Sequence, residues 1–281
     1  MANNNDADLF RVEGQVAIIT GAGSGLGRMM AHSLASNGAQ KVYVVGRRLE
    51  KLQDTASGYE NIVPIVGDAT RKDSLQAVAD QVKAEVGHVN VLIVNSGSSG
   101  PGMNSIPSDA PIKDVQQNLW SISEDDMNKV YAINNTGAYF TAVAFLELLD
   151  AGNKSAARTG IQSQIIFTAS LAGYARALST NVPYSTSKAA TIHLVKLLST
   201  YLAKHDIRVN GVAPGIYPSE MTEGMTDRPG FNVNTIPAHR LGTEEDMRGT
   251  ILFLTSRAGA YTNGLVLISD GGRLGQMPAT Y

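Results

Sequence analysis

Three side chains in one stretch of the sequence have the types and spacing needed for proton transfer. Tyr184 and Lys188 stand four residues apart, so on a helix the hydroxyl and the ammonium group lie on the same face. A phenol has a pKa near ~10 and exchanges protons poorly at neutral pH until a neighbouring cation stabilises its phenolate. Ser170 ends an apolar, β-branched run that is typical of a buried strand. A tyrosine and a lysine at this spacing also occur by chance in helices, so the rest of the chain must support the assignment.

A glycine-rich turn near the start of the chain indicates a place for a pyrophosphate. The apolar run 16–20 leads directly into residues 21–27, which open a helix predicted over 26–37. Glycine lets the backbone turn tightly and approach a ligand, and the amides of a helix N-terminus meet phosphate charge. The turn therefore predicts a dinucleotide site that includes Gly21, Ser24, Gly25, Leu26 and Gly27.

Two arginines follow the second predicted strand, residues 41–45. A ribose-binding acid is expected about twenty residues past the glycines, and Arg47 and Arg48 stand there instead. Arg47 could pair with a 2′-phosphate and Arg48 could stack on the adenine, which favours NADP(H) over NAD(H). The alternative is a pair of solvated arginines at the start of a helix.

Strands and helices alternate along the whole chain, which implies parallel strands with right-handed crossovers. The predicted fold class is α/β, a single-domain doubly wound Rossmann fold with about seven parallel strands flanked by helices. Further strands are predicted at 62–66, 91–94 and 165–170, and further helices at 72–86, 123–150 and 183–205. Residues 1–11 are predicted to be a disordered tail, and residues 12–281 to be the domain.

The composition argues against several classes of protein. The 281 residues include 23 basic and 25 acidic ones, without a long run of either sign, so no nucleic-acid or anionic-membrane partner is expected. There is no cysteine, and the five histidines are scattered, so we expect no metal site. The N-terminal residues lack the pattern of a signal peptide, and no apolar run is long enough for a membrane helix. We expect a cytoplasmic protein.

Taken together, these motifs resemble the short-chain dehydrogenase/reductase family. The similarity runs from about residue 12 to residue 272 and ends in the Ser-Asp-Gly-Gly sequence at 269–272. Within the family the chain resembles fungal reductases of biosynthetic pathways. The motifs stand in the family's order: residues 20–27, Asn95-Ser-Gly97, Asn134, Ser170, Tyr184-x-x-x-Lys188 and Pro214-Gly215.

The resemblance implies a role for each matching residue. Ser170 would bind and polarise a substrate carbonyl, Tyr184 would transfer the proton, and Lys188 would lower the pKa of the tyrosine and hold the nicotinamide ribose. Asn134 would hold a water that links Lys188 to solvent, and Asn135 is the competing assignment. The remaining cofactor contacts are expected from Asp68, Ala69, Asn95, Gly97, Pro214, Gly215 and Ser219.

Three serines depart from the family pattern. Ser96 replaces an alanine, Ser219 stands where a threonine often contacts the cofactor amide, and Ser24 occupies a position that is often basic in NADP-preferring members. None of these belongs to the proton-transfer machinery. The NADP(H) prediction therefore depends mainly on Arg47.

Two long segments after strands are predicted to roof the cleft. Residues 98–118 are rich in Pro, Gly and Ser, and residues 216–238 contain Tyr217, Met221, Met225 and Phe231. Adaptable apolar side chains favour a bulky ketone or alcohol over a small hydroxy acid, with Tyr217 and Met221 as substrate contacts. Alternatively, the first segment is a surface insertion and the apolar side chains pack on a neighbouring subunit.

The sequence thus predicts an NADP(H)-dependent oxidoreductase that interconverts a ketone and a secondary alcohol. The alternatives are a non-redox enzyme in the same pocket and an NADP(H)-binding scaffold or sensor without turnover. The broad apolar coverage of the helices at 123–150 and 183–205 predicts a homotetramer, or a homodimer, formed through them.

Overall fold

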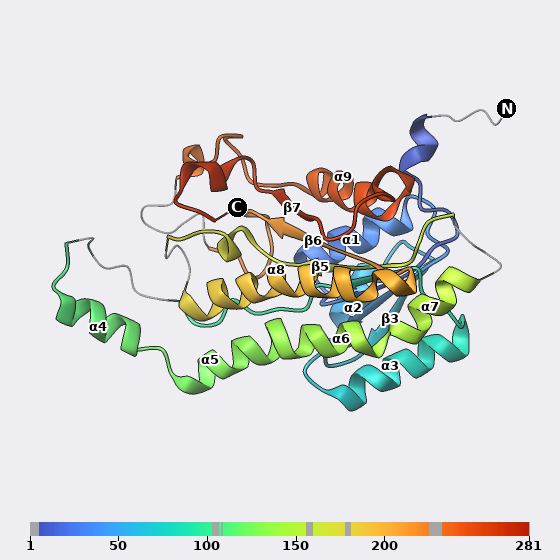
Figure 1. Ribbon diagram of the computed structural model, residues 1–281, viewed down its shortest axis with the longest axis horizontal. Helices are drawn as coiled ribbons and strands as arrows, with labels where there is room; N and C mark the ends of the chain where they lie inside the picture. Colours follow the sequence, from blue (N-terminus) through green and yellow to red (C-terminus); the bar gives the residue numbers. More distant parts are fainter. Residues whose placement is uncertain are drawn as a thin grey trace.

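Seven parallel strands form one sheet in the order β3-β2-β1-β4-β5-β6-β7 (Figure 1). The computed structural model describes residues 6–102, 107, 109–155, 160–177, 181–224 and 232–280. The strands are β1 Val16–Thr20, β2 Lys41–Gly46, β3 Ile62–Val66, β4 Val91–Val94, β5 Gln164–Thr168, β6 Arg208–Pro214 and β7 Val266–Ser269. The predicted fold class is confirmed.

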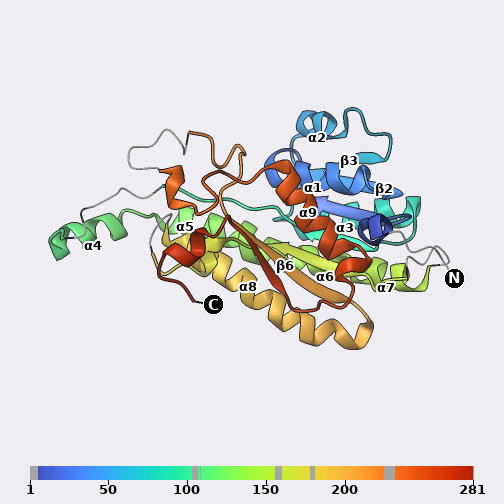
Figure 2. The same ribbon diagram turned by 90° about the horizontal axis from the view of Figure 1, so that it is seen from above.

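The central strands are buried along their whole length because both faces of the sheet are covered. Every residue of β1, β4 and β5 is buried, as expected for parallel strands with helices on both sides. Helices α1 Gly25–Ala35, α2 Leu49–Ala56 and α9 Glu244–Thr255 pack on one face. Helices α3 Lys72–Glu85, α6 Ala138–Ala144 and α8 Val182–Leu202 pack on the other (Figure 2).

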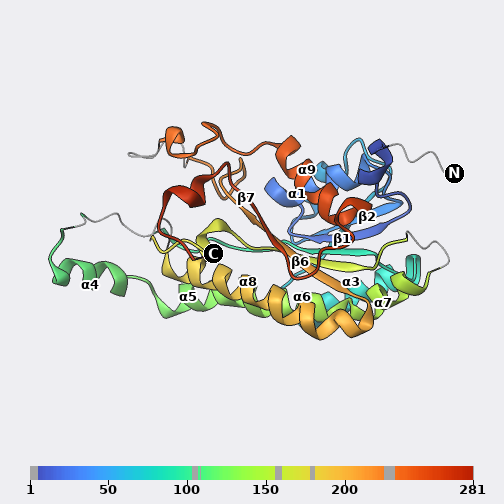
Figure 3. The same cartoon turned by 45° about the horizontal axis from the view of Figure 1, so that its top comes forward.

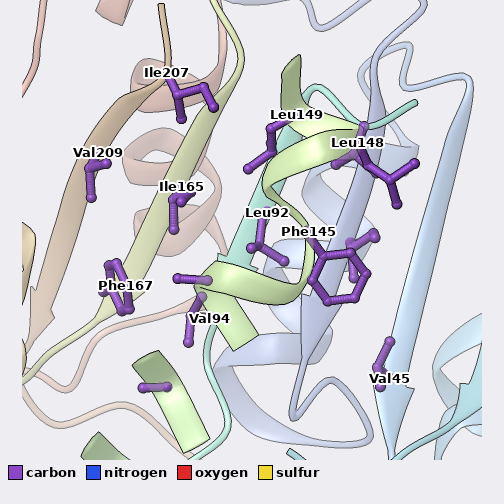
Figure 4. Close-up of a cluster of buried hydrophobic side chains, with 14 of the residues drawn as sticks. Val45, Leu92, Val94, Phe145, Leu148, Leu149, Ile165, Phe167, Ile207 and Val209 are labelled. Carbon is purple, nitrogen blue, oxygen red and sulfur yellow. The ribbon is translucent and has the colours of Figure 1, made fainter. Parts of the chain in front are cut away.

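On the face covered by α3, α6 and α8, the core includes the residues where α6 ends and the next helix begins. Phe145, Leu148 and Leu149 lie against the strand residues Leu92 and Val94 (Figure 4). Phe145 has φ −106° and ψ 7°, which ends α6 and starts α7 Leu146–Lys154. Burial of this aromatic side chain thus coincides with a break in the helix.

The helix predicted over residues 123–150 is divided further by a π-helical segment. α5 Glu124–Tyr131 runs into Ala132–Gly137, whose π-helical geometry widens the turn before α6 begins. Such bulges are frequent at functional sites because they redirect side chains and free backbone groups. Here the bulge contains Asn134 and Asn135, both of which contact α8.

Part of the segment expected to be a loop is a helix. α4 Ile112–Trp120 has no buried residue and projects away from the sheet (Figure 3). Ile112 and Trp120 are 81% and 85% exposed. Residues 103–106 and 108 of the 98–118 segment lie outside the described residues.

Part of the segment predicted to be an N-terminal tail has local structure. Residues 1–5 lie outside the described residues, but Asp6–Phe10 forms a 3-10 helix. Arg257 donates a hydrogen bond to the carbonyl of Asp8 (3.4 Å). The segment 6–10 is thus joined to the loop after α9.

Candidate active site

A cleft of about 910 Å³ opens at the carboxyl ends of the central strands. The chain crosses the sheet between β3 and β4, so the loops after β1 and β4 diverge there, and open α/β sheets bind ligands at such a point. All the residues predicted for the site line this cleft except Gly27 and Asn134. Those two lie directly behind its wall.

Three glycines of the turn have no space for a side chain. Gly21 has φ +66°, and a Cβ there would lie 2.9 Å from the Cα of Ser96. Gly25 has φ +53°, and its Cβ would lie 2.8 Å from the Cβ of Ser219. At Gly27 a Cβ would lie 2.4 Å from the carbonyl oxygen of Gly21. The turn therefore presents bare backbone at the N-terminus of α1, which fits the pyrophosphate of a dinucleotide.

Ser170, Tyr184 and Lys188 come together in the cleft from two elements. Ser170 lies two residues beyond β5, and its hydroxyl is close enough to Tyr184 to lower the pKa of the phenol. Tyr184 and Lys188 lie in the first two turns of α8. The Lys188 ammonium donates to the carbonyl of Thr168 (2.7 Å) and lies 5.8 Å from the centroid of the Tyr184 ring. The expected spacing on one helix face is thus realised.

Burial controls the charge of these two groups. It raises the pKa of Tyr184, and the nearby hydroxyl of Ser170 acts in the opposite direction. Burial lowers the pKa of Lys188 to about 8. Near neutral pH the site therefore holds a neutral phenol beside a protonated amine, the state required to donate a proton to a carbonyl oxygen.

Asn134 holds the wall of the cleft. Its amide donates to the carbonyl of Ser98 and to the hydroxyl of Ser187 (both 2.9 Å), and its oxygen accepts from the amide of Ser98 (2.9 Å). Both amide hydrogens are thereby used, while the side-chain oxygen keeps one acceptor position for a water. Asn135 donates instead to the carbonyl of Ser187 (2.9 Å).

At the other end of the cleft Arg47 and Arg48 have different surroundings. Arg48 forms an ion pair with Glu220 (2.8 Å) from the segment after β6. Hydrogen bonds from Thr70 hold the pKa of the Asp68 carboxyl below its usual range, with a smaller contribution from Arg47. Arg47 therefore lies near the carboxyl end of β3, where the adenosine half of a dinucleotide is expected.

The two predicted substrate contacts are not equivalent. Tyr217 lines the cleft but is 3% exposed, and its hydroxyl is hydrogen-bonded to Ser269 (2.7 Å). Met221 is exposed at the mouth, so it is the more accessible apolar contact. Met225 and Phe231 lie outside the described residues.

Sequence reasoning missed several residues of the cleft. Some of these belong to loops already identified, while Lys129 lies on α5 and Asn181, behind the wall, caps α8. A polar residue just before a predicted helix is a capping signal that could have identified Asn181. The missed lining residues include Lys51, Thr70, Ser98, Lys129, Glu220 and Thr222.

Comparison with known proteins agrees with this geometry. The sequence model of the short chain dehydrogenase family matches residues 15–230. The short-chain dehydrogenase/reductase SAT3 of Stachybotrys chartarum is 46% identical over 272 residues, which cover 90% of this chain and all of that protein. The chain therefore belongs to the short-chain dehydrogenase/reductase family, and it is an oxidoreductase of that family.

Solved structures support the same assignment. The chain resembles RhlG of Pseudomonas aeruginosa in an NADP complex, with a TM-score of 0.81, 28% identity and coverage of 95% of this chain and 99% of that one. It also resembles a gluconate 5-dehydrogenase from Burkholderia cenocepacia in complex with NADP and tartrate. There the TM-score is 0.80, the identity 27% and the coverage 96% and 99%.

Within the described part of the chain, no helix combines the length and the apolar character required to cross a membrane. Among those same residues, no three His, Cys, Asp or Glu side chains gather into a candidate metal site.

Proposed function

We propose that the protein uses NADP(H) to interconvert a bulky, mainly apolar ketone and its secondary alcohol. The observation that carries the proposal is the buried triad of Ser170, Tyr184 and Lys188, which opens into the cleft lined by Met221. A phenol beside a protonated amine can deliver a proton to a ketone oxygen. Met221 adds an adaptable apolar surface.

Each residue of the triad has a defined task. Ser170 donates a hydrogen bond to the carbonyl oxygen and stabilises the charge that develops there. Tyr184 transfers its proton to that oxygen, and the ammonium of Lys188 stabilises the resulting phenolate. NADP(H), when bound, supplies or accepts the hydride at the carbonyl carbon. Lys188 also holds the nicotinamide ribose, and Asn134 links Lys188 to solvent.

The remaining predicted residues hold the cofactor. The backbone of the glycine turn receives the pyrophosphate, and Arg47 pairs with the 2′-phosphate, which favours NADP(H). Two structural neighbours that carry NADP support this choice. Arg48 stacks on the adenine only if its ion pair with Glu220 opens.

A substrate screen with product identification tests the proposal. We expect NADPH to be consumed with a bicyclic ketone such as a decalone, with the corresponding alcohol as product, and less rapidly with 5-keto-D-gluconate. Tyr184→Phe should abolish turnover and leave NADPH binding intact. NADPH binding without turnover of any carbonyl compound would favour a scaffold or sensor, and a product of unchanged oxidation state would favour a non-redox enzyme.

The protein is also proposed to be a homo-oligomer, a tetramer or a dimer. Tyr139 and Val143 on α6 and Leu197 and Tyr201 on α8 are exposed apolar residues, and these two helices lie side by side (Figure 1). A second copy of the chain would remove them from water.

A further inference from the structure

Asn181 stands at the junction between the catalytic helix and the wall of the cleft. It is the N-cap of α8, with extended backbone (φ −140°, ψ 163°), and only 3% of its surface is exposed. Its Oδ1 accepts a hydrogen bond from the backbone amide of Tyr184 (2.7 Å). The asparagine thereby satisfies one free amide of the helix start and fixes the first turn, which carries the reactive phenol.

The other end of the same side chain holds a different segment. Its Nδ2 donates to the carbonyl oxygens of Ser99 and Pro101 (both 2.7 Å). The partners also fix the orientation of the amide, since a flipped group would point its oxygen at two carbonyl oxygens. All three hydrogen bonds are 2.7 Å long and come from a buried side chain, so each contributes to the position of the segment.

This segment is part of the cleft. Ser98 and Gly97 line the cleft, and the amide and carbonyl of Ser98 are both held by Asn134. Gly100 has φ +68°, and a Cβ there would lie 2.6 Å from Cγ2 of Val130, so the segment lies tightly against α5. Asn134 and Asn181 therefore hold residues 98–101 from two sides.

We propose that Asn181 is a positioning residue that sets the distance between Tyr184 and the wall formed by residues 98–101. It acts through backbone groups and has no contact with the reacting atoms. The kinetic part of this inference rests on the proposed function, because it concerns the fit of the substrate beside Tyr184. The structural part, the link between two segments, is independent of the reaction.

Asn181→Asp separates the two tasks of the side chain. A carboxylate still accepts from the Tyr184 amide and is a good N-cap, but it loses both donors and turns an oxygen toward the carbonyls of Ser99 and Pro101. Asn61→Asp is the matched control. The amide of Asn61 also donates to two backbone carbonyls, those of Ala35 (3.1 Å) and Ala39 (2.8 Å), before β3 at the opposite edge of the sheet.

Hydrogen exchange of the cofactor-free protein is the first measurement. In Asn181→Asp, the peptide covering residues 96–102 should exchange at least about tenfold faster, as expected for two lost hydrogen bonds. The peptide covering residues 182–190 should be unchanged, and Asn61→Asp should alter neither. Exchange of the 96–102 peptide at the native rate would overturn the positioning role and leave Asn181 as a helix cap. Acceleration of both peptides would overturn it as well, because the substitution would then act on α8 itself. If the aspartate variant does not fold, Asn181→Ser, which also keeps a cap and loses both donors, is measured in its place.

Steady-state kinetics with NADPH and a decalone is the second measurement. We expect KM for the ketone to rise at least about tenfold in Asn181→Asp while kcat stays within about threefold and NADPH affinity is unchanged. A fall in kcat at constant KM would overturn the positioning role. Absence of ketone reductase activity would refute the proposed function. The exchange measurement needs no turnover, so it would still decide whether Asn181 links the two segments.

Discussion

Lys188 is a cation buried at the base of the cleft, and its burial has a measurable effect on stability. Its pKa is lowered from 10.5 to about 8 in the folded protein, so between these values the unfolded chain binds a proton that the folded chain does not. The free energy of unfolding of the native sequence therefore rises with pH across this window. Below about pH 8 the destabilisation is fully present.

Lys188→Met should therefore stabilise the cofactor-free protein near neutral pH while it abolishes turnover. The expected gain is on the order of 1–3 kcal/mol. Removal of the buried charge stabilises the folded protein, and loss of the hydrogen bond to Thr168 offsets part of that gain. The gain should shrink as the pH rises above about 8. Urea denaturation at several pH values measures it. Lys196→Met, an exposed site on the same helix, is the control, and an equal gain there would argue against burial as the cause.

Arg47 carries the prediction of cofactor choice. Arg47→Ala should weaken NADPH binding by about tenfold and leave NADH binding unchanged, because only NADPH offers a 2′-phosphate to the guanidinium. Titration followed by nicotinamide fluorescence is the measurement. Arg48→Ala is the comparison, and a larger loss in that variant would assign the phosphate to Arg48.

Among the elements, the segment after β6 connects the two ends of the cleft. It places Met221 at the mouth of the cleft, and its Glu220 forms an ion pair with Arg48. The pKa of the Glu220 carboxyl is lowered mainly by its hydrogen bond to Arg48. A negative side chain therefore stands where the phosphate of NADP(H) is expected to bind.

Glu220→Gln should bind NADPH about two- to fivefold more tightly at low salt, because a carboxylate beside the two arginines no longer repels the 2′-phosphate. NADH lacks this phosphate, so its affinity should change less. Glu223→Gln, in the same segment, makes the same change in net charge and should have little effect. An equal gain in NADPH affinity in both variants would indicate a long-range effect of net charge. It would contradict a specific role of Glu220 at the phosphate site.

Elements with a strong local pattern were predicted correctly from the sequence. The apolar runs at β1, β3 and β4 coincide with the observed strands because short runs bounded by turn residues admit little else. α4 was missed because its surroundings are rich in Pro, Gly and Ser. The spacing of Ile112, Val115 and Leu119 nevertheless fits one face of a helix.

Tertiary contacts explain what the sequence did not reveal. The segment 123–150 contains no proline, yet it is divided at Ala132–Gly137 and again at Phe145. The hydrogen bonds of Asn134 to Ser98 and Ser187, and the packing of Phe145 on the sheet, accompany these breaks. Likewise, Asn181 and Glu220 act on segments far away in the sequence, and no local pattern identifies such partners.

At the scale of the whole molecule, the exposed faces of α6 and α8 predict self-association. Leu197 and Tyr201 are 55% and 66% exposed, so a double change to glutamate should shift the protein to a monomer. Light scattering at micromolar concentration measures the mass of each variant. Leu49→Glu on α2, in the other helical layer, is the control. A native protein that is already monomeric would refute the prediction.

The exposed helix α4 also supplies a spectroscopic probe. The chain contains a single tryptophan, Trp120, at the end of this helix and 85% exposed. Indole emission of the native protein therefore originates at one place, outside the core and apart from the ten tyrosines. A blue shift on addition of a ketone would show that α4 is covered when substrate binds, and a blue shift with rising protein concentration would show that a second copy covers it. Unchanged emission in both titrations would mean that α4 stays in water throughout.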